Sequence, residues 1–162
     1  MQIMGLDSLT RKLTRQFMQQ PMRRFFTRAA IAVQSGAKER APVDTGRLRS
    51  SLTYEIDPAA LPAWAKVGTN VSYAPFMEYG TGRLSESPES TSAWHTPSGA
   101  DLAVWARRHN TDGYMVAAAI ARRGGLRPRR YLRGSFEANR DNIRAYLKQA
   151  GGEIREAWNS GN

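Results

Sequence analysis

A proline ends the first helical segment of this chain and determines where a sheet can begin. Residues 38–52 read KERAPVDTGRLRSSL, in which Ala41 precedes Pro42. A residue before proline is pushed out of the α-helical region, so we expect the helix to end at Ala41. Asp44 and Gly46 supply turn chemistry, because Asp bonds backbone two residues on and Gly accepts a positive φ. The stretch therefore predicts a long helical segment that turns into a strand.

Apolar residues recur every three or four positions on both sides of Pro21, which is the pattern of amphipathic helices. We expect one helix over residues 6–20 and a second that starts at Pro21, since a proline in the first turn costs no hydrogen bond. We interpret the apolar stripe of the second helix as core packing. Its members are Met22, Phe25, Phe26, Ala29, Val33 and Ala37.

Two short strands are predicted after the turn. Residues 50–57 alternate polar and apolar side chains, and residues 64–69 form a second run after a break at Asp57-Pro58. We expect these runs to pair as a hairpin with a loose connection. Glu55 and Asp57 would share one sheet face, and we interpret them as solvated or paired with Arg rather than as an acid–base pair.

Residues 73–82, YAPFMEYGTG, predict a short helix that Pro75 opens and Gly80 ends. We interpret this block as a turn whose three aromatic side chains pack against the sheet. A phosphate-binding role is disfavoured, because the sequence contains neither GxxxxGK[ST] nor a full GxGxxG.

Residues 83–123 are interpreted as an insert. Residues 83–98 are rich in Ser, Thr, Pro and Glu, which predicts an exposed loop, with Trp94 as its anchor and His95 as a solvated side chain. Two short helices are expected over residues 99–109 and 114–123. A DNA-reading helix-turn-helix is disfavoured, because the second helix, YMVAAAIARR, is apolar around most of its circumference.

The C-terminal part combines a basic segment with a final helix. Residues 126–133, LRPRRYLR, are expected to be extended, with Pro128 on an edge strand or at a strand start. The final helix is predicted over residues 135–150, and residues 151–162 are expected to add a short helical turn and then fray. Its predicted buried face carries Phe136, Ile143, Tyr146 and Leu147.

Positive charge dominates the chain but is unevenly spread. The net charge is +10 over 162 residues. Residues 1–50 hold ten Lys and Arg against three acids, residues 51–98 hold two against five, and residues 99–133 hold eight against two. Such a distribution fits either a phosphate-facing surface or a subunit interface. We expect no disulfide and no membrane span, because the chain has no cysteine and no run of about 18 apolar residues.

Three blocks of the chain resemble the small neck and tail-completion proteins of long-tailed phages, the lambdoid head–tail joining group. They are APVDTGRLRSSL, YAPFMEYGTG and RPRRYLRGSFEANRDNI, and the resemblance covers residues 5–82 and 124–150. It implies a structural virion protein that forms a ring, expected to be a hexamer, at the head–tail junction or the tail end. The implied partners are further copies of the chain, neighbouring neck and tail proteins, and DNA touched non-specifically in the ring lumen. The implied location is the virion, after assembly in the host cytoplasm.

We therefore predict an α+β fold in a single domain over residues 1–162, with N-terminal helices packed on a small antiparallel sheet, a helical insert and a C-terminal helix. No cofactor, metal or catalytic residue is expected, because no nucleophile–base pair, metal cluster or phosphate loop is visible. The alternative function is a basic module that contacts nucleic-acid backbone without sequence readout. The predicted interface residues are Arg47, Arg49, Tyr79, Arg127, Arg129, Arg130 and Arg133.

Overall fold

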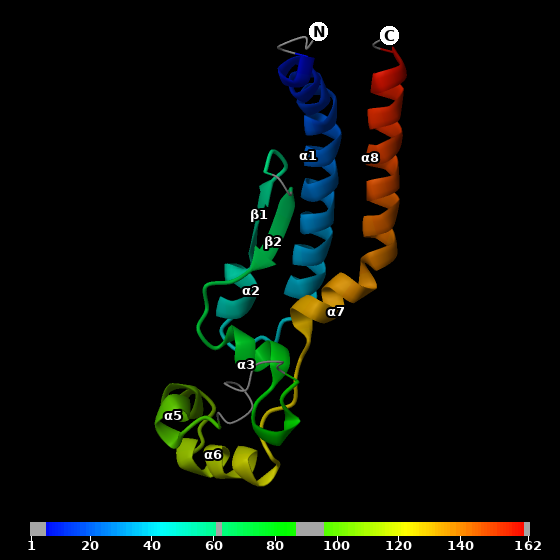
Figure 1. Cartoon of the computed structure of the whole chain (residues 1–162). Coiled ribbons are helices and arrows are strands. Elements are labelled where there is room, and N and C mark those ends of the chain that lie inside the picture. Colours follow the sequence, from blue (N-terminus) through cyan, green and yellow to red (C-terminus); the bar gives the residue numbers. More distant parts are fainter. Residues whose placement is uncertain (1–5, 61–62, 87–95, 161–162) are drawn as a thin grey trace.

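The computed structural model describes residues 6–60, 63–86 and 96–160. Two long helices, α1 and α8, lie side by side, and a two-stranded hairpin also packs on α1 (Figure 1). Helices α5 and α6 pack on each other and form an arm at the end of the molecule far from both termini. This arrangement confirms the predicted α+β fold. The elements are α1 (Leu6–Arg40), α2 (Arg47–Ser51), β1 (Thr53–Asp57), β2 (Trp64–Gly68), α3 (Ala74–Tyr79), the 3₁₀ turn η1 (Gly82–Leu84), α5 (Gly99–Arg108), α6 (Gly113–Arg122), α7 (Tyr131–Ala138) and α8 (Arg140–Ser160).

Helix α1 continues through Pro21, so the prediction of two separate helices is wrong. An internal proline costs a helix about 3 kcal/mol, and contacts with α8 offset that cost. Pro21 is buried. Arg24 Nη2 lies 2.5 Å from Glu153 Oε2, and the Arg28 guanidinium stacks 4.1 Å from the centre of the Tyr146 ring. Tertiary packing here overrides the local signal.

The turn after α1 leads into a short helix before the strand. The first helix ends at Arg40, one residue from the predicted end. Gly46 takes φ 79° directly before α2, in which Leu48 is buried. Residues 50–52 are therefore not part of a strand, which starts at Thr53. The predicted antiparallel hairpin is confirmed, with exposed Glu55 opposite Lys66.

The core lies where α1, α2, α3 and α7 meet. Tyr131, at 1 % exposed, is the largest fully buried side chain among the described residues. Ser135 of α7 donates a hydrogen bond to the carbonyl of Val33 at 2.7 Å. A Cβ at Gly36 would lie 2.5 Å from Ser135 Oγ, so the missing side chain allows α7 to cross α1 closely. The buried cluster consists of Ala37, Ala41, Leu48, Leu52, Val71, Ala74 and Tyr131.

The C-terminal predictions need three corrections. Residues 126–130 are irregular, the sheet in the described residues contains β1 and β2 alone, and α7 already begins at Tyr131. Residues 151–160 continue α8 rather than fraying, because this part of the helix packs on α1. Phe136 and Leu147, predicted as buried, are 49 % and 50 % exposed. The predicted roles of Trp94 and His95 lie outside the described residues.

Candidate functional site

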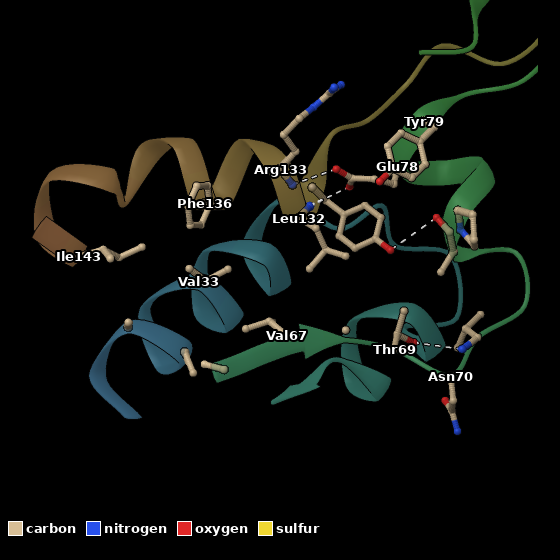
Figure 2. Close-up of a pocket in the computed structure, with 18 of the residues that line it drawn as sticks. Val33, Val67, Thr69, Asn70, Glu78, Tyr79, Leu132, Arg133, Phe136 and Ile143 are labelled. Carbon is tan, nitrogen blue, oxygen red and sulfur yellow. Dashed lines mark hydrogen bonds between the residues drawn. The ribbon is translucent and has the colours of Figure 1, made fainter. Parts of the chain in front are cut away.

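An open groove of about 840 Å³ crosses one face of the molecule (Figure 2). Helix α1, strand β2, helix α3, helix α7 and the start of α8 all contribute to it. Most of its lining is apolar, and Phe136 and Ile143 belong to this lining rather than to a closed core. Its principal side chains are Phe25, Phe26, Ala29, Ala30 and Val33 of α1, Ala65 and Val67 of β2, Pro75, Glu78 and Tyr79 of α3, and Tyr131, Leu132, Arg133, Phe136 and Ile143 of α7 and α8.

A buried carboxylate joins the two halves of this groove. Glu78 on α3 is 4 % exposed. Its two carboxylate oxygens accept hydrogen bonds from the backbone N–H groups of Leu132 and Arg133, each at 2.8 Å. These N–H groups belong to the first turn of α7, where no partner exists within the helix and the helix dipole favours negative charge. Glu78 thus acts as a remote cap that holds α7 against α3.

A second carboxylate pairs with two of the predicted interface arginines. Arg130 Nε donates to Glu86 Oε2 at 2.7 Å, and the Nη2 atoms of Arg130 and Arg133 also bond to Glu86. The hydrogen bond from Arg130, with a further one from Arg133, holds the pKa of the Glu86 carboxyl below its usual range. Arg130 adopts φ 49° directly before α7. Some of the guanidinium N–H donors of the two arginines are therefore already used within the chain.

The seven predicted interface residues fall into two groups. Tyr79, Arg130 and Arg133 come together at the junction of α3 and α7, where Tyr79 and Arg133 line the groove. The other four side chains are exposed and form no hydrogen bond or ion pair with described residues. They are Arg47 and Arg49 on α2, and Arg127 and Arg129 on the segment before α7. Whether any of the seven contacts another molecule stays a prediction.

The base of the arm is a close crossing of two backbones. Thr81 N donates to Leu126 O at 3.0 Å, and Arg83 N donates to Gly124 O at 2.6 Å. Gly125 takes φ 122°, and a Cβ there would lie 1.9 Å from Thr81 O. The glycines of the YGTG block and of the Gly124-Gly125 pair thus allow this crossing. Tyr73, one of the three aromatic side chains of this block that were predicted to pack against the sheet, is instead 39 % exposed.

A polar contact also fastens the arm to the turn after α1. Asp44 accepts from Arg108 at 3.1 Å and lies 2.9 Å from His109 Nε2. The sequence predicted a local role for Asp44 in its own turn, whereas the carboxylate reaches across 65 positions to the end of α5. Sequence reasoning missed this contact, the groove and the roles of Glu78 and Glu86. One signal was available, because Glu78 is the only charged residue in the block YAPFMEYGTG.

The described residues offer little for metal chemistry. No group of three or more His, Cys, Asp or Glu among them could hold a metal ion. Every buried side-chain nitrogen and oxygen in the described part has a hydrogen-bond partner. No helix there is long and apolar enough to cross a membrane. The main feature of the site is the apolar groove, which has Arg133 in its lining.

Comparison with known proteins gives one match. Residues 6–80 match a family model described as "Bacteriophage HK97-gp10, putative tail-component". No curated protein and no solved structure matches the chain. The matched segment contains α1, the hairpin and α3, while the third block of the resemblance, residues 124–150, lies beyond it. The match confirms the resemblance to tailed-phage proteins and supports a structural role in a phage tail. Over residues 6–80, this chain is thus similar to the HK97-gp10-like putative tail components of bacteriophages.

Proposed function

We propose that this chain is a structural virion protein that assembles into a ring, of six copies, at the head–tail junction or the tail end, where it completes the tail and supports head–tail joining. The observation that carries the proposal is the family match over residues 6–80. Each subunit of the ring would be a single domain over residues 1–162. Its work is shape and charge complementarity, so no catalytic role is proposed for any residue.

The surface of the isolated chain supports an assembly role. A monomer rarely leaves a large apolar hollow open to solvent, and such a surface is typical of a protein–protein contact. The groove is of this kind, and it has arginines at one end. Arginine is enriched at interfaces because its planar guanidinium can donate two parallel hydrogen bonds to one carboxylate. Neighbouring neck and tail proteins are the expected partners of this basic surface.

A second function, contact with DNA backbone, is favoured by the net charge of +10. If exposed arginines faced a ring lumen, they would touch phosphates without reading sequence. This contact would accompany assembly rather than replace it. The alternative is a stand-alone nucleic-acid-binding module, and solution measurements separate the two.

The test combines mass measurement with charge reversal. We would determine the mass of the purified protein by light scattering after size exclusion, at low and high salt, with and without a duplex of mixed sequence. Assembly with itself or with tail and neck proteins that persists in salt supports the proposal. A monomer that binds DNA tightly, and loses it steeply as salt rises, refutes it in favour of the alternative.

Arg127 and Arg129 are the best positions for charge reversal, because their side chains have no partner among the described residues. Arg127→Glu with Arg129→Glu should leave a folded monomer and weaken assembly or DNA contact. Arg130 is unsuitable, since its reversal would place two carboxylates together at Glu86. Arg140→Glu, on the exposed side of α8, serves as the matched control. Normal assembly of the double variant would remove these two arginines from the interface.

A further inference from the structure

Helix α6 exposes an apolar face that nothing in its own chain covers. Tyr114 and Met115 are 71 % and 72 % exposed. Ala118 and Ala121 are also exposed and lie three to seven positions further on, along the same side of the helix. The opposite side, which packs on α5, is apolar as well. A helix that is apolar all round belongs in a buried setting, so this outer face lacks a partner.

We propose that the outer face of α6, formed by Tyr114, Met115, Ala118 and Ala121, docks into the apolar groove of a second copy of this chain. The inference rests on the proposed assembly function and names the two surfaces that would form its contact. A helix that lays an apolar face into a hydrophobic groove is a common way of binding between proteins. The groove presents Phe25, Phe26 and Val67 for this purpose.

The arm cannot fill the groove of its own chain. The backbone crossing at Thr81 and Leu126 fixes its base. The bonds from Asp44 to Arg108 and His109 brace α5 from the other side. Figure 1 shows the arm beyond α3, at the end of the molecule opposite the termini. The groove, in contrast, is lined by residues of α1 and β2 as well as of α3, α7 and α8. The occupant must therefore be another molecule.

Charge favours a second copy as that molecule. Residues 53–68, which form the hairpin, hold one basic residue against two acids. Residues 99–123, which form the arm, hold four basic residues against two acids. Contact between the arm of one copy and the hairpin side of another brings opposite net charges together, which favours this pairing over groove-to-groove or arm-to-arm contact.

The geometry of the contact favours a closed ring. The two surfaces differ, so each copy would give its arm to one neighbour and its groove to the next, and such head-to-tail contacts close into rings or continue as filaments. A helix of ten residues is about 15 Å long. One face of it buries less than the roughly 800 Å² per partner of a stable pairwise interface. A single contact between two copies should thus be weak, and closure of the ring should stabilise all the contacts together.

Cysteine pairing tests the contact directly, because the natural chain has no cysteine. One variant carries Met115→Cys and another carries Ala65→Cys, at an exposed position that lines the groove. Mixed under mild oxidation, the two should give a disulfide-linked pair in much higher yield than either variant alone. Glu55→Cys, on the exposed opposite face of the hairpin, is the matched control and should not link to Met115→Cys.

A second variant measures the strength of the contact. Met115→Lys keeps a good helix former at an exposed position, so the fold should persist. Loss of the methionine side chain from the proposed contact should weaken self-association about tenfold or more. Assembly that persists unchanged in Met115→Lys, with no selective linkage between positions 115 and 65, overturns this contact and leaves the proposed ring standing. Absence of any self-association in the unaltered protein, alone or with its tail partners, overturns both.

Discussion

Replacement of Glu78 is the sharpest test of how the two halves of the fold are held together. Its buried carboxylate accepts two backbone N–H groups of the first turn of α7. A hydrogen bond to a charged group contributes about 1.5–3 kcal/mol, and a negative charge at a helix N-terminus adds about 0.3–2 kcal/mol. Glu78→Ala loses both bonds and the charge, so we expect it to cost about 3–8 kcal/mol of the free energy of unfolding.

Glu78→Gln separates charge from shape. The amide keeps one acceptor oxygen and presents an NH₂ group to the other backbone N–H, so one bond and the charge are lost. We expect a cost of about 2 kcal/mol, between the wild type and Glu78→Ala. Glu39→Gln removes an exposed carboxylate from the last turn of α1. As a matched control it should stay within about 0.5 kcal/mol of the wild type.

The assay is urea unfolding followed by far-UV circular dichroism at pH 7, at one low protein concentration, since assembly would add apparent stability. Amide hydrogen exchange adds a local readout, because Leu132 and Arg133 should lose protection first. If Glu78→Gln were as stable as the wild type, the charge of the cap would be irrelevant. If Glu78→Ala were also as stable as the wild type, the cap would not hold α7 at all.

Two further predictions concern the arm and the core. Gly125→Ala should detach the base of the arm, because its Cβ would meet Thr81 O at 1.9 Å. Limited proteolysis should then cut the chain near residue 125. As a control, Gly152→Ala, in open space within α8, should raise the free energy of unfolding by about 0.5–1 kcal/mol. An arm that resists protease in Gly125→Ala would argue against this crossing. Burial, with the nearby Glu78 charge second, raises the pKa of Tyr131 to about 12. An unfolded tyrosine ionises near pH 10, so the unfolded state loses its proton first and stability should fall between pH 10 and pH 12 by up to about 3 kcal/mol. Tyr131→Phe should remove that part of the decline in urea unfolding, and an unchanged decline would refute the assignment.

Local chemistry allowed the prediction of most elements of this fold. The hairpin, the short helix ended by Gly80, and the two helices of the arm all follow from alternation, helical spacing and glycine position. The errors occur where distant parts of the chain decide the outcome. Pro21 stays inside α1 because α8 packs against it, and nothing within about ten residues of Pro21 carries that information.

The candidate site was harder to predict for the same reason. The arginines at 130 and 133 were expected to face other molecules, yet Glu86, more than forty positions earlier, pairs with both. Ion pairs between exposed side chains leave no periodic pattern in a sequence. Phe136 and Leu147 were predicted to be buried, yet both side chains are about half exposed. Helical spacing identifies the apolar face of a helix, but it does not say whether the surface that packs on this face belongs to the same chain.

The groove cannot exist in the family-matched segment alone, and this links Glu78 to the proposed contact between copies as well as to stability. Residues 6–80 supply α1, β2 and α3, whereas the opposing wall comes from residues 131–143. Glu78 lies two residues before the end of the matched segment and holds the first turn of that wall in place. A variant that loosens this cap should therefore widen or flatten the groove even where the chain stays folded. Glu78→Gln should then weaken self-association while Met115→Lys leaves the stability of the fold unchanged, and the two variants together distinguish damage to the groove from damage to its occupant.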